Sequence, residues 1–236
     1  DDPIAIDDIK KFIAEQDLKE EHRYIPRIKH DYGKKIAVVG AGPAGLSCAY
    51  YLAEDGYKVT VFEKRAALGG MLTLGIPSFR LEKNVVNAEI DVLKALGVEF
   101  KTGVEVGKDL SLAELRAQGF KAFYLAIGAQ AGRRLGLEGE DAQGVVTGVD
   151  FLREGNLGAA ERLSGKVVVI GGGNVAIDVA RSAVRMGAAE VSMYCLEARQ
   201  EMPALEEEVE EALAERIAIN NSWGPKRILV EGGKVK

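Results

Sequence analysis

Lys35-Ile36-Ala37-Val38-Val39-Gly40-Ala41-Gly42-Pro43-Ala44-Gly45 is the stretch of sequence that decides the fold. Its first five residues form a short apolar run that glycine ends, which predicts a buried parallel strand. Helix-forming residues follow over 46–54. In between, Gly40 permits a tight turn, Gly42 lets the backbone approach a pyrophosphate, and Gly45 lets the helix pack closely on the strand. The stretch therefore predicts a dinucleotide-binding strand, turn and helix, with the helix N-terminus directed at the phosphates.

A carboxylate stands where such a site needs one. The run Lys58-Val59-Thr60-Val61-Phe62 predicts a second strand that ends at Glu63, where this fold places the acid that accepts hydrogen bonds from ribose hydroxyls. Gly69-Gly70 can bring further backbone amides near a phosphate, and Tyr124-Leu125-Ala126-Ile127-Gly128-Ala129 predicts a strand that runs into a glycine turn. These two pieces favour a flavin nucleotide over a nicotinamide nucleotide. A glycine turn of purely structural use is the alternative, which the ordered strands, helix and acid disfavour.

A second fingerprint repeats this pattern. Lys166-Val167-Val168-Val169-Ile170 predicts a strand, Gly171-Gly172-Gly173-Asn174-Val175-Ala176 the turn, and residues 175–186 the helix. Alanine replaces the third glycine at Ala176, a variant that the dinucleotide fold accepts. The second strand of this unit is Glu190-Val191-Ser192-Met193-Tyr194-Cys195. Two nucleotide sites in one chain suggest that electrons pass between two cofactors.

The end of that second strand bears on cofactor preference. Cys195 takes the place that Glu63 has in the first unit, and Leu196, Glu197, Ala198 and Arg199 follow. A 2′-phosphate site generally has a basic residue here, whereas Glu197 would repel a phosphate and can bind a free ribose hydroxyl. The sequence therefore favours NADH over NADPH. The alternative is that Glu197 is a solvated loop acid.

Five runs of residues together carry a family resemblance: 37–50, 69–72, 75–81, 169–178 and 201–204. They resemble the small-subunit family of bacterial glutamate synthase. Ile76-Pro77-Ser78-Phe79-Arg80-Leu81 is also similar to the flavin and pyridine-nucleotide region of dihydropyrimidine dehydrogenase. The resemblance covers nearly the whole chain, and the joint set of motifs is far more specific than either glycine fingerprint alone.

The resemblance implies FAD at the first site, a reduced nicotinamide cofactor at the second, and electron transfer through iron-sulfur clusters to a synthase-type or iron-sulfur partner. It also implies that Arg80 and the turn at Gly75 lie near the flavin, and that the nicotinamide domain is inserted into the flavin domain. Family members that use NADPH generally show paired arginines where this chain has Leu196 and Glu197, although Arg199 remains. Hydride passes between cofactors in such a protein, so no catalytic acid–base residue is required.

The cysteines and histidines exclude several other kinds of site. Cys48 and Cys195 are the two cysteines, too few for an iron-sulfur cluster and too far apart for a C-x-x-C redox pair. His22 and His30 lie in a linker and are too isolated for a metal site or a nucleophilic triad. The family carries an N-terminal cysteine-rich segment and a C-terminal return to the flavin sheet, so we expect a chain truncated at both ends.

The composition fits an α/β protein that binds neither nucleic acid nor membrane. The 236 residues are 47% hydrophobic and include 28 glycines, as suits a fold with many tight turns. The net charge is −5, and no basic stripe alternates with aromatic residues, which disfavours nucleic acid as a partner. The apolar runs all fall short of the roughly 20 residues that a membrane span needs. We therefore expect a cytoplasmic protein.

The expected organisation is α/β, with two Rossmann-like dinucleotide-binding domains. Residues 1–32 are an N-terminal helix and linker, 33–132 the FAD-binding domain, 133–163 a connector, and 164–236 an incomplete NAD(P)-binding domain. Within these domains we expect a helix near 84–96, a strand pair near 98–106, an acidic helix over 205–215 with a solvated face, and a hairpin at the C-terminus.

Motifs and resemblance together give one set of predicted cofactor-binding residues. At the first site they are Gly40, Gly42, Pro43, Ala44, Gly45, Glu63, Lys64, Gly69, Gly70, Arg80, Val106 and Gly128; at the second site they are Gly171, Gly172, Gly173, Asn174, Val175, Ala176, Glu197 and Arg199. The leading hypothesis is a flavoprotein oxidoreductase module that passes hydride from NAD(P)H to FAD. A non-catalytic nucleotide-binding or scaffolding module is the alternative. A flavin monooxygenase or oxidase would need a substrate domain, for which the chain has no room.

Overall fold

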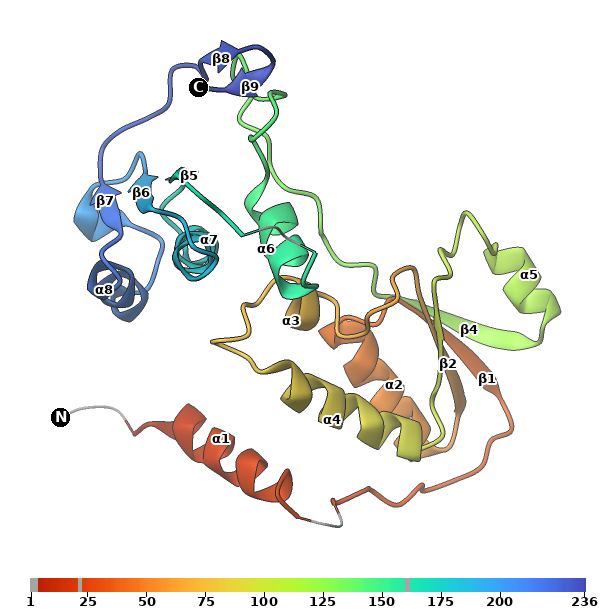
Figure 1. The fold of residues 1–236 in the computed structure, drawn as a ribbon. Coiled ribbons are helices and arrows are strands. Elements are labelled where there is room, and N and C mark those ends of the chain that lie inside the picture. The colour runs from red at the N-terminus through yellow and green to blue at the C-terminus, as the bar shows by residue number, and fades with distance from the viewer. Residues whose placement is uncertain (1–3, 21–22, 160–161) are drawn as a thin grey trace. The chain divides into compact units, whose positions relative to one another are not determined.

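The computed structural model describes residues 4–20, 23–159 and 162–236, and within them the chain forms two compact units (Figure 1). The first unit holds the described residues up to Thr73 together with Leu81–Gly128. The second unit holds Leu74–Arg80 and the described part of Ala129–Lys236. A short stretch of the chain therefore leaves the first unit, joins the second and returns.

The first unit is built on a four-stranded parallel sheet. Its strands are β1 (Lys35–Val39), β2 (Lys58–Glu63), β3 (Glu99–Thr102) and β4 (Phe120–Leu125), in the order β3-β2-β1-β4. Its helices are α1 (Ile6–Asp17), α2 (Pro43–Asp55), α3 (Met71–Leu74), which ends at the border of the unit, α4 (Lys83–Ala95) and α5 (Leu112–Ala117). Parallel strands joined through helices are typical of the dinucleotide fold.

Alternation along β1 and β2 gives the first sheet two apolar faces. Val38 and Val61 point to one face, where they form a buried cluster with residues of α2 and α4 such as Ala49 and Leu93. Residues one position away point to the other face, where Phe62 packs near Leu115 of α5. Both faces of the sheet are thus covered, as a buried parallel sheet requires.

The second unit has a smaller parallel sheet and its own core. Its strands are β5 (Lys166–Ile170), β6 (Glu190–Tyr194) and β7 (Ala218–Asn220), in that order, with an antiparallel hairpin of β8 (Val230–Glu231) and β9 (Lys234–Val235). Its helices are α6 (Gly148–Asn156), α7 (Asn174–Arg185), the 3-10 turn η1 (Arg199–Glu201) and α8 (Glu206–Ala214). Ile177 of α7, Met193 of β6 and Val209 of α8 are fully buried at its centre.

These units confirm the expected α/β fold, and their division of the chain differs from the expected domains at two places. Helix α1 and its linker belong to the first unit, where Arg23 donates hydrogen bonds to Asp17 and to the carbonyl of Ala88 at 2.8 Å. The expected connector belongs to the second unit, because its helix α6 packs against α7, with Val179 close to Gly148. Residues 1–3 and 21–22, including His22, and residues 160–161 lie outside the described part of the chain.

The expected strand pair near 98–106 is wrong in its second half. Only β3 forms, and Val106 makes an isolated bridge with Leu110 instead of a strand. The physical reason is Gly103, whose φ of +72° turns the chain out of the extended conformation just after β3. The expected helices near 84–96 and 205–215 and the C-terminal hairpin are confirmed by α4, α8 and β8–β9. Among the described residues, every helix is too short or too polar to cross a lipid bilayer.

Candidate dinucleotide sites

Glycine is sterically required at two positions of the first turn. A Cβ built on Gly40 would lie 2.2 Å from the carbonyl oxygen of Ala126, directly after β4, and Gly40 has a φ of +106°. A Cβ built on Gly45 would lie 1.9 Å from the carbonyl oxygen of Gly40. The first clash is with the residue that follows β4, and the second is with the strand-to-helix turn. These contacts are the close packing that the sequence motif predicts.

Gly42 differs from its neighbours because the protein leaves space beside it. The nearest atom to a Cβ built on Gly42 is the Cα of Gly70, at an ordinary 3.9 Å, and its φ of −76° suits any residue. Gly42 is the N-cap of α2, and its helix has no side-chain cap. The first backbone N–H groups of α2 are therefore available to an anion. The arrangement fits the pyrophosphate of FAD.

The second glycine pair lies against this turn. The amide of Gly69 donates to the carbonyl of Ala41 at 2.9 Å, and a Cβ built on Gly70 would lie 2.6 Å from the Cα of Gly42. The pair thus brings backbone close to the glycine turn, and its role toward a phosphate stays a prediction.

Glu63 is held in place at the end of β2. Its carboxylate accepts hydrogen bonds from the amide of Ala41 and from the amide of Arg65, each at 2.9 Å, and the residue is 6% exposed. The hydrogen bond from Ala41 thus ties the Glu63 carboxylate to the glycine turn. This is the position from which a carboxylate can bind ribose hydroxyls.

The other predicted first-site residues lie further out. Lys64 is exposed beside Glu63, and Gly128, with a φ of +69°, follows the carboxyl end of β4. Val106 packs against the cluster around Phe62 and Leu115. Their roles toward a cofactor stay predictions.

The second turn has the same plan with looser packing. The amide of Gly171 donates to the carbonyl of Tyr194 at the end of β6, at 2.9 Å. Gly173 is the N-cap of α7, which has no side-chain cap, and nothing lies within 4 Å of a Cβ built on it. Ala176 occupies the third position of the motif, where its Cβ would be 3.3 Å from one built on Gly171. The start of α7 thus also fits a pyrophosphate.

Helix α8 is tied to this second turn. The amide of Ala204 donates to the carbonyl of Gly172 at 3.1 Å, and the amide of Leu205, the N-cap of α8, donates to the side chain of Asn174 at 2.9 Å. Asn174 is therefore used inside the protein, whereas the neighbouring Val175 is exposed. The second glycine turn and the start of α8 are therefore joined directly by hydrogen bonds.

The loop after β6 carries the residues expected to sense a 2′-phosphate. The Glu197 carboxylate oxygen lies 3.1 Å from a Cβ built on Gly172, so this acid stands over the glycine turn. Arg199 forms a bidentate ion pair with Glu206. Cys195 is buried, burial raises the pKa of its thiol, and Asn221 contacts its sulfur at 3.2 Å.

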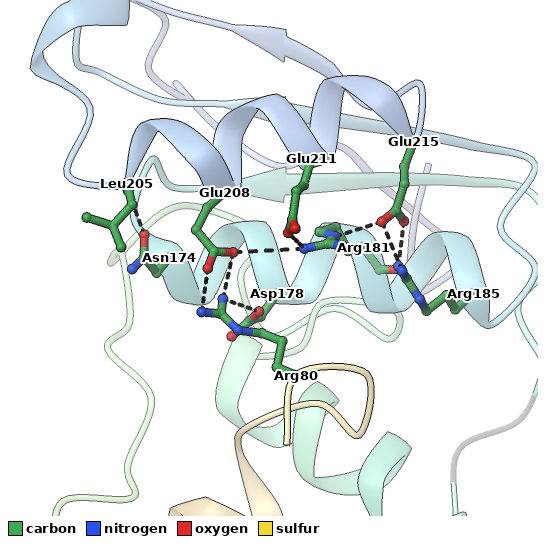
Figure 2. A network of polar contacts seen from close by, with 9 residues as sticks. All are labelled: Arg80, Asn174, Asp178, Arg181, Arg185, Leu205, Glu208, Glu211 and Glu215. Carbon is green, nitrogen blue, oxygen red and sulfur yellow. Dashed lines mark hydrogen bonds and ion pairs between the residues drawn. The ribbon is translucent and has the colours of Figure 1, made fainter. Parts of the chain in front are cut away.

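A network of ion pairs, which sequence reasoning missed, lies on one side of α7 (Figure 2). Arg80 contacts Asp178 of α7 at 2.9 Å and Glu208 of α8 at 2.7 Å. Burial raises the pKa of the Asp178 carboxyl, while the hydrogen bond and charge of Arg80 oppose that rise. The resemblance places Arg80 near the flavin, and the structure shows its guanidinium bound to the second unit.

The expected solvated face of the acidic helix is confirmed for Glu206, Glu207, Glu210 and Glu211, which are exposed, whereas Glu208 is half-buried. Glu206, Glu208 and Glu211 also form ion pairs with arginines. No signal within the run itself distinguishes Glu208 from the exposed glutamates. The pairing depends on Arg80 and on Arg181 of α7, which lie far from the glutamates of α8 in the sequence.

No metal-ligand cluster occurs in the part of the chain that the structure describes, and the same residues leave no buried polar side-chain atom without a hydrogen-bond partner. His30 stacks near Tyr32 at a centroid distance of 5.3 Å.

Comparison with known proteins agrees with this geometry. Residues 34–223 match the pyridine nucleotide-disulphide oxidoreductase family. The NADP(+)-dependent formate dehydrogenase subunit beta of Moorella thermoacetica is 41% identical to this chain; the alignment covers all of this chain and 37% of that protein. The glutamate synthase [NADPH] small chain of Escherichia coli is 36% identical to this chain; the alignment covers 98% of this chain and 52% of that protein. The chain thus spans about a third to a half of the length of these relatives.

A solved structure shows the same fold. FprA of Mycobacterium tuberculosis, in complex with NADPH, superimposes with a TM-score of 0.71 over 86% of this chain and 62% of that chain, at 20% identity. This chain therefore shares its α/β fold with FprA.

Proposed function

This chain belongs to the pyridine nucleotide-disulphide oxidoreductase family, as a member like the glutamate synthase small chain, and on that basis we propose that it oxidises NADPH with bound FAD and passes the electrons to a partner. One observation carries the proposal: each unit has a glycine, Gly42 or Gly173, that the protein alone does not need there for steric reasons. A glycine beside open space at an uncapped helix N-terminus suits a ligand that approaches the backbone.

The chain's own residues have binding and orienting roles in this proposal. The start of α2, with Gly42 and Gly70, holds the pyrophosphate of FAD, and Glu63 binds its ribose. The start of α7, with Gly173, holds the pyrophosphate of the nicotinamide nucleotide. FAD, when bound, supplies the hydride acceptor, so the protein needs to provide binding, orientation and exclusion of water.

NADPH as the donor replaces the preference for NADH that Glu197 predicted. The support is that the names of two relatives, at 41% and 36% identity, carry NADP(+) and NADPH. Arg199 is the cation that we propose for the 2′-phosphate, and its present partner Glu206 would have to share it. A guanidinium can bind both a carboxylate and a phosphate through its several N–H groups.

The proposed partner is a subunit or domain of iron-sulfur or synthase type. The relatives are named as a beta subunit and as a small chain, which supports a role inside a larger assembly. We propose the cytoplasm as the compartment, because both cysteines are free thiols.

The visible spectrum tests the function directly. We expect the protein with bound FAD to lose its flavin absorbance under anaerobic conditions when NADPH is added, and to need at least about tenfold more NADH for the same loss, because a matched 2′-phosphate contact is worth about 1.4 kcal/mol or more. Equal bleaching by NADH would contradict the choice of donor. Binding of both nucleotides without bleaching would support the alternative, a non-catalytic scaffold.

Gly173→Ala tests the second site alone. The new methyl meets nothing within 4 Å in the protein, so we expect unchanged folding, but it stands where the backbone should approach the pyrophosphate. We expect NADPH affinity, measured by calorimetry, to fall at least about tenfold, or 1.4 kcal/mol, with FAD content unchanged. Wild-type affinity would mean that the turn does not bind the nucleotide.

A further inference from the structure

We infer that Arg80 is a positioning residue that makes the order of residues 74–80 depend on nucleotide binding at the second turn. This inference rests on the proposed function, since it assumes that the second turn binds NADPH. We call residues 74–80 the anchored segment. The chain enters the second unit at Leu74 and leaves it after Arg80, between two helices that pack in the first unit.

The beginning of the anchored segment is held by one side chain of α6. The amide of Asn156 donates to the carbonyl of Leu74 at 3.0 Å and to the carbonyl of Ile76 at 3.2 Å. Leu74 itself is 2% exposed. These contacts replace the secondary-structure bonds that the segment lacks after α3.

The end of the anchored segment is held by charge. The guanidinium of Arg80 forms a bidentate pair with Glu208 and a single contact of 2.9 Å with Asp178 (Figure 2). Its side chain is 29% exposed, and those of Asp178 and Glu208 are 12% and 13% exposed. The two carboxylates are thus largely buried while Arg80 stays partly accessible, and a bidentate arginine pair fixes orientation as well as position.

Phe79 adds a second hold on α7. The Arg185 guanidinium lies 3.9 Å from the centre of the Phe79 ring, and that of Arg181 lies 4.9 Å from it. Arg181 and Arg185 are themselves fixed by ion pairs to Glu215 of the segment that follows α8. Arg80 and Phe79 therefore contact one surface, which α7 and α8 form together.

That surface continues into the second turn. Asp178 lies one helical turn after Asn174, and Glu208 lies in the first turn of α8, whose N-cap Leu205 is bonded to Asn174. A nucleotide bound at the start of α7 would therefore restrain the same two helices that hold Arg80. By thermodynamic reciprocity, a segment that is better ordered with nucleotide bound must in turn strengthen nucleotide binding.

The test combines nucleotide affinity with hydrogen exchange of the anchored segment, in the full chain with FAD. In wild type we expect saturating NADPH to slow amide exchange in peptides covering 74–80. Arg80→Met should abolish that slowing and raise the Kd for NADPH about tenfold, within the usual range of coupling between sites. Arg80→Lys should recover part of both effects, because it restores the charge without the bidentate geometry.

Two further variants keep the test readable. Glu208→Gln removes one partner while preserving its shape, so it remains usable if Arg80→Met leaves Asp178 unpaired and lowers stability. If the residues act through one pair, the double variant should bind NADPH no more weakly than Arg80→Met alone. Arg134→Met, which removes an ion pair with Asp141 elsewhere in the second unit, is the matched control and should behave as wild type.

The outcomes separate the inference from the proposed function. Wild type that binds neither NADPH nor NADH would contradict the proposed function and the coupling with it. Wild type that binds NADPH, with an unchanged Kd and unchanged protection of 74–80 in both Arg80→Met and Glu208→Gln, would overturn the inference alone. A tenfold weaker Kd without any change in exchange would also overturn it, since the anchored segment would then play no part.

Discussion

We expect Gly42→Ala to prevent binding of the proposed FAD and to leave the fold intact. The new methyl has 3.9 Å to its nearest neighbour, and the backbone at Gly42 has an ordinary negative φ, so no strain arises in the protein itself. A methyl at this position stands between the backbone and a pyrophosphate that should approach it. We expect FAD affinity to fall at least about 100-fold, equivalent to about 2.7 kcal/mol, measured as flavin content after purification and as Kd on reconstitution.

The control for Gly42→Ala is the equivalent change in the other unit. Gly173→Ala should keep FAD and lose nicotinamide affinity, and Gly42→Ala should do the reverse. Stability is compared between FAD-free proteins, because bound FAD alone would stabilise the wild type by mass action. Alanine is a poorer N-cap than glycine, and this is the reason for which we expect Gly42→Ala to lower the free energy of unfolding, by about 1 kcal/mol at most. A Gly42→Ala protein that retains its full flavin content would show that the first glycine turn does not bind FAD.

Gly45→Ala has the largest expected effect on stability. Its Cβ would lie 1.9 Å from the Gly40 carbonyl oxygen and 3.3 Å from the Val38 side chain, so α2 would have to move away from β1. The carbonyl belongs to the turn and cannot rotate aside as a long side chain could. We expect the first unit to lose about 3 kcal/mol of stability, the upper part of the range for overpacked cores, measured by urea unfolding.

Ala176→Gly is the matched variant for Gly45→Ala, because the two residues hold the same place in the two turns. Alanine is already accommodated at 176, and glycine there costs only helix propensity, about 1 kcal/mol. We therefore expect Gly45→Ala to lower the stability of the first unit strongly and Ala176→Gly to lower the stability of the second unit only slightly. Equal effects would mean that α2 stands no closer to its strand than α7.

The parts of the fold that the sequence predicts well depend on neighbours in the chain. β1, the turn at Gly40 and β2 up to Glu63 follow from apolar runs, glycines and one acid at fixed spacing. The same holds for β5 and α7, whose predicted bounds differ from the observed ones by a residue at most. These elements are specified locally, so the pattern of residues suffices.

The parts that escaped prediction depend on contacts between distant residues. Arg80 is paired with Asp178 and Glu208, and nothing near Arg80 in the sequence indicates either partner. The same is true of Asn156, which holds the backbone of Leu74. The sequence does not indicate for the same reason that residues 74–80 group with the second unit, since long-range contacts place them there.

The Glu63 carboxylate is already oriented before any ligand arrives. Two backbone amides fix its rotamer, at 2.9 Å each, and each oxygen retains a further lone pair for a ribose hydroxyl. A glutamate free in solvent would lose its rotational entropy on binding, a cost of about 0.5–1.5 kcal/mol for an immobilised side chain. Here folding has met that cost in advance, so the proposed hydrogen bonds to a ribose would contribute to affinity with less entropic loss.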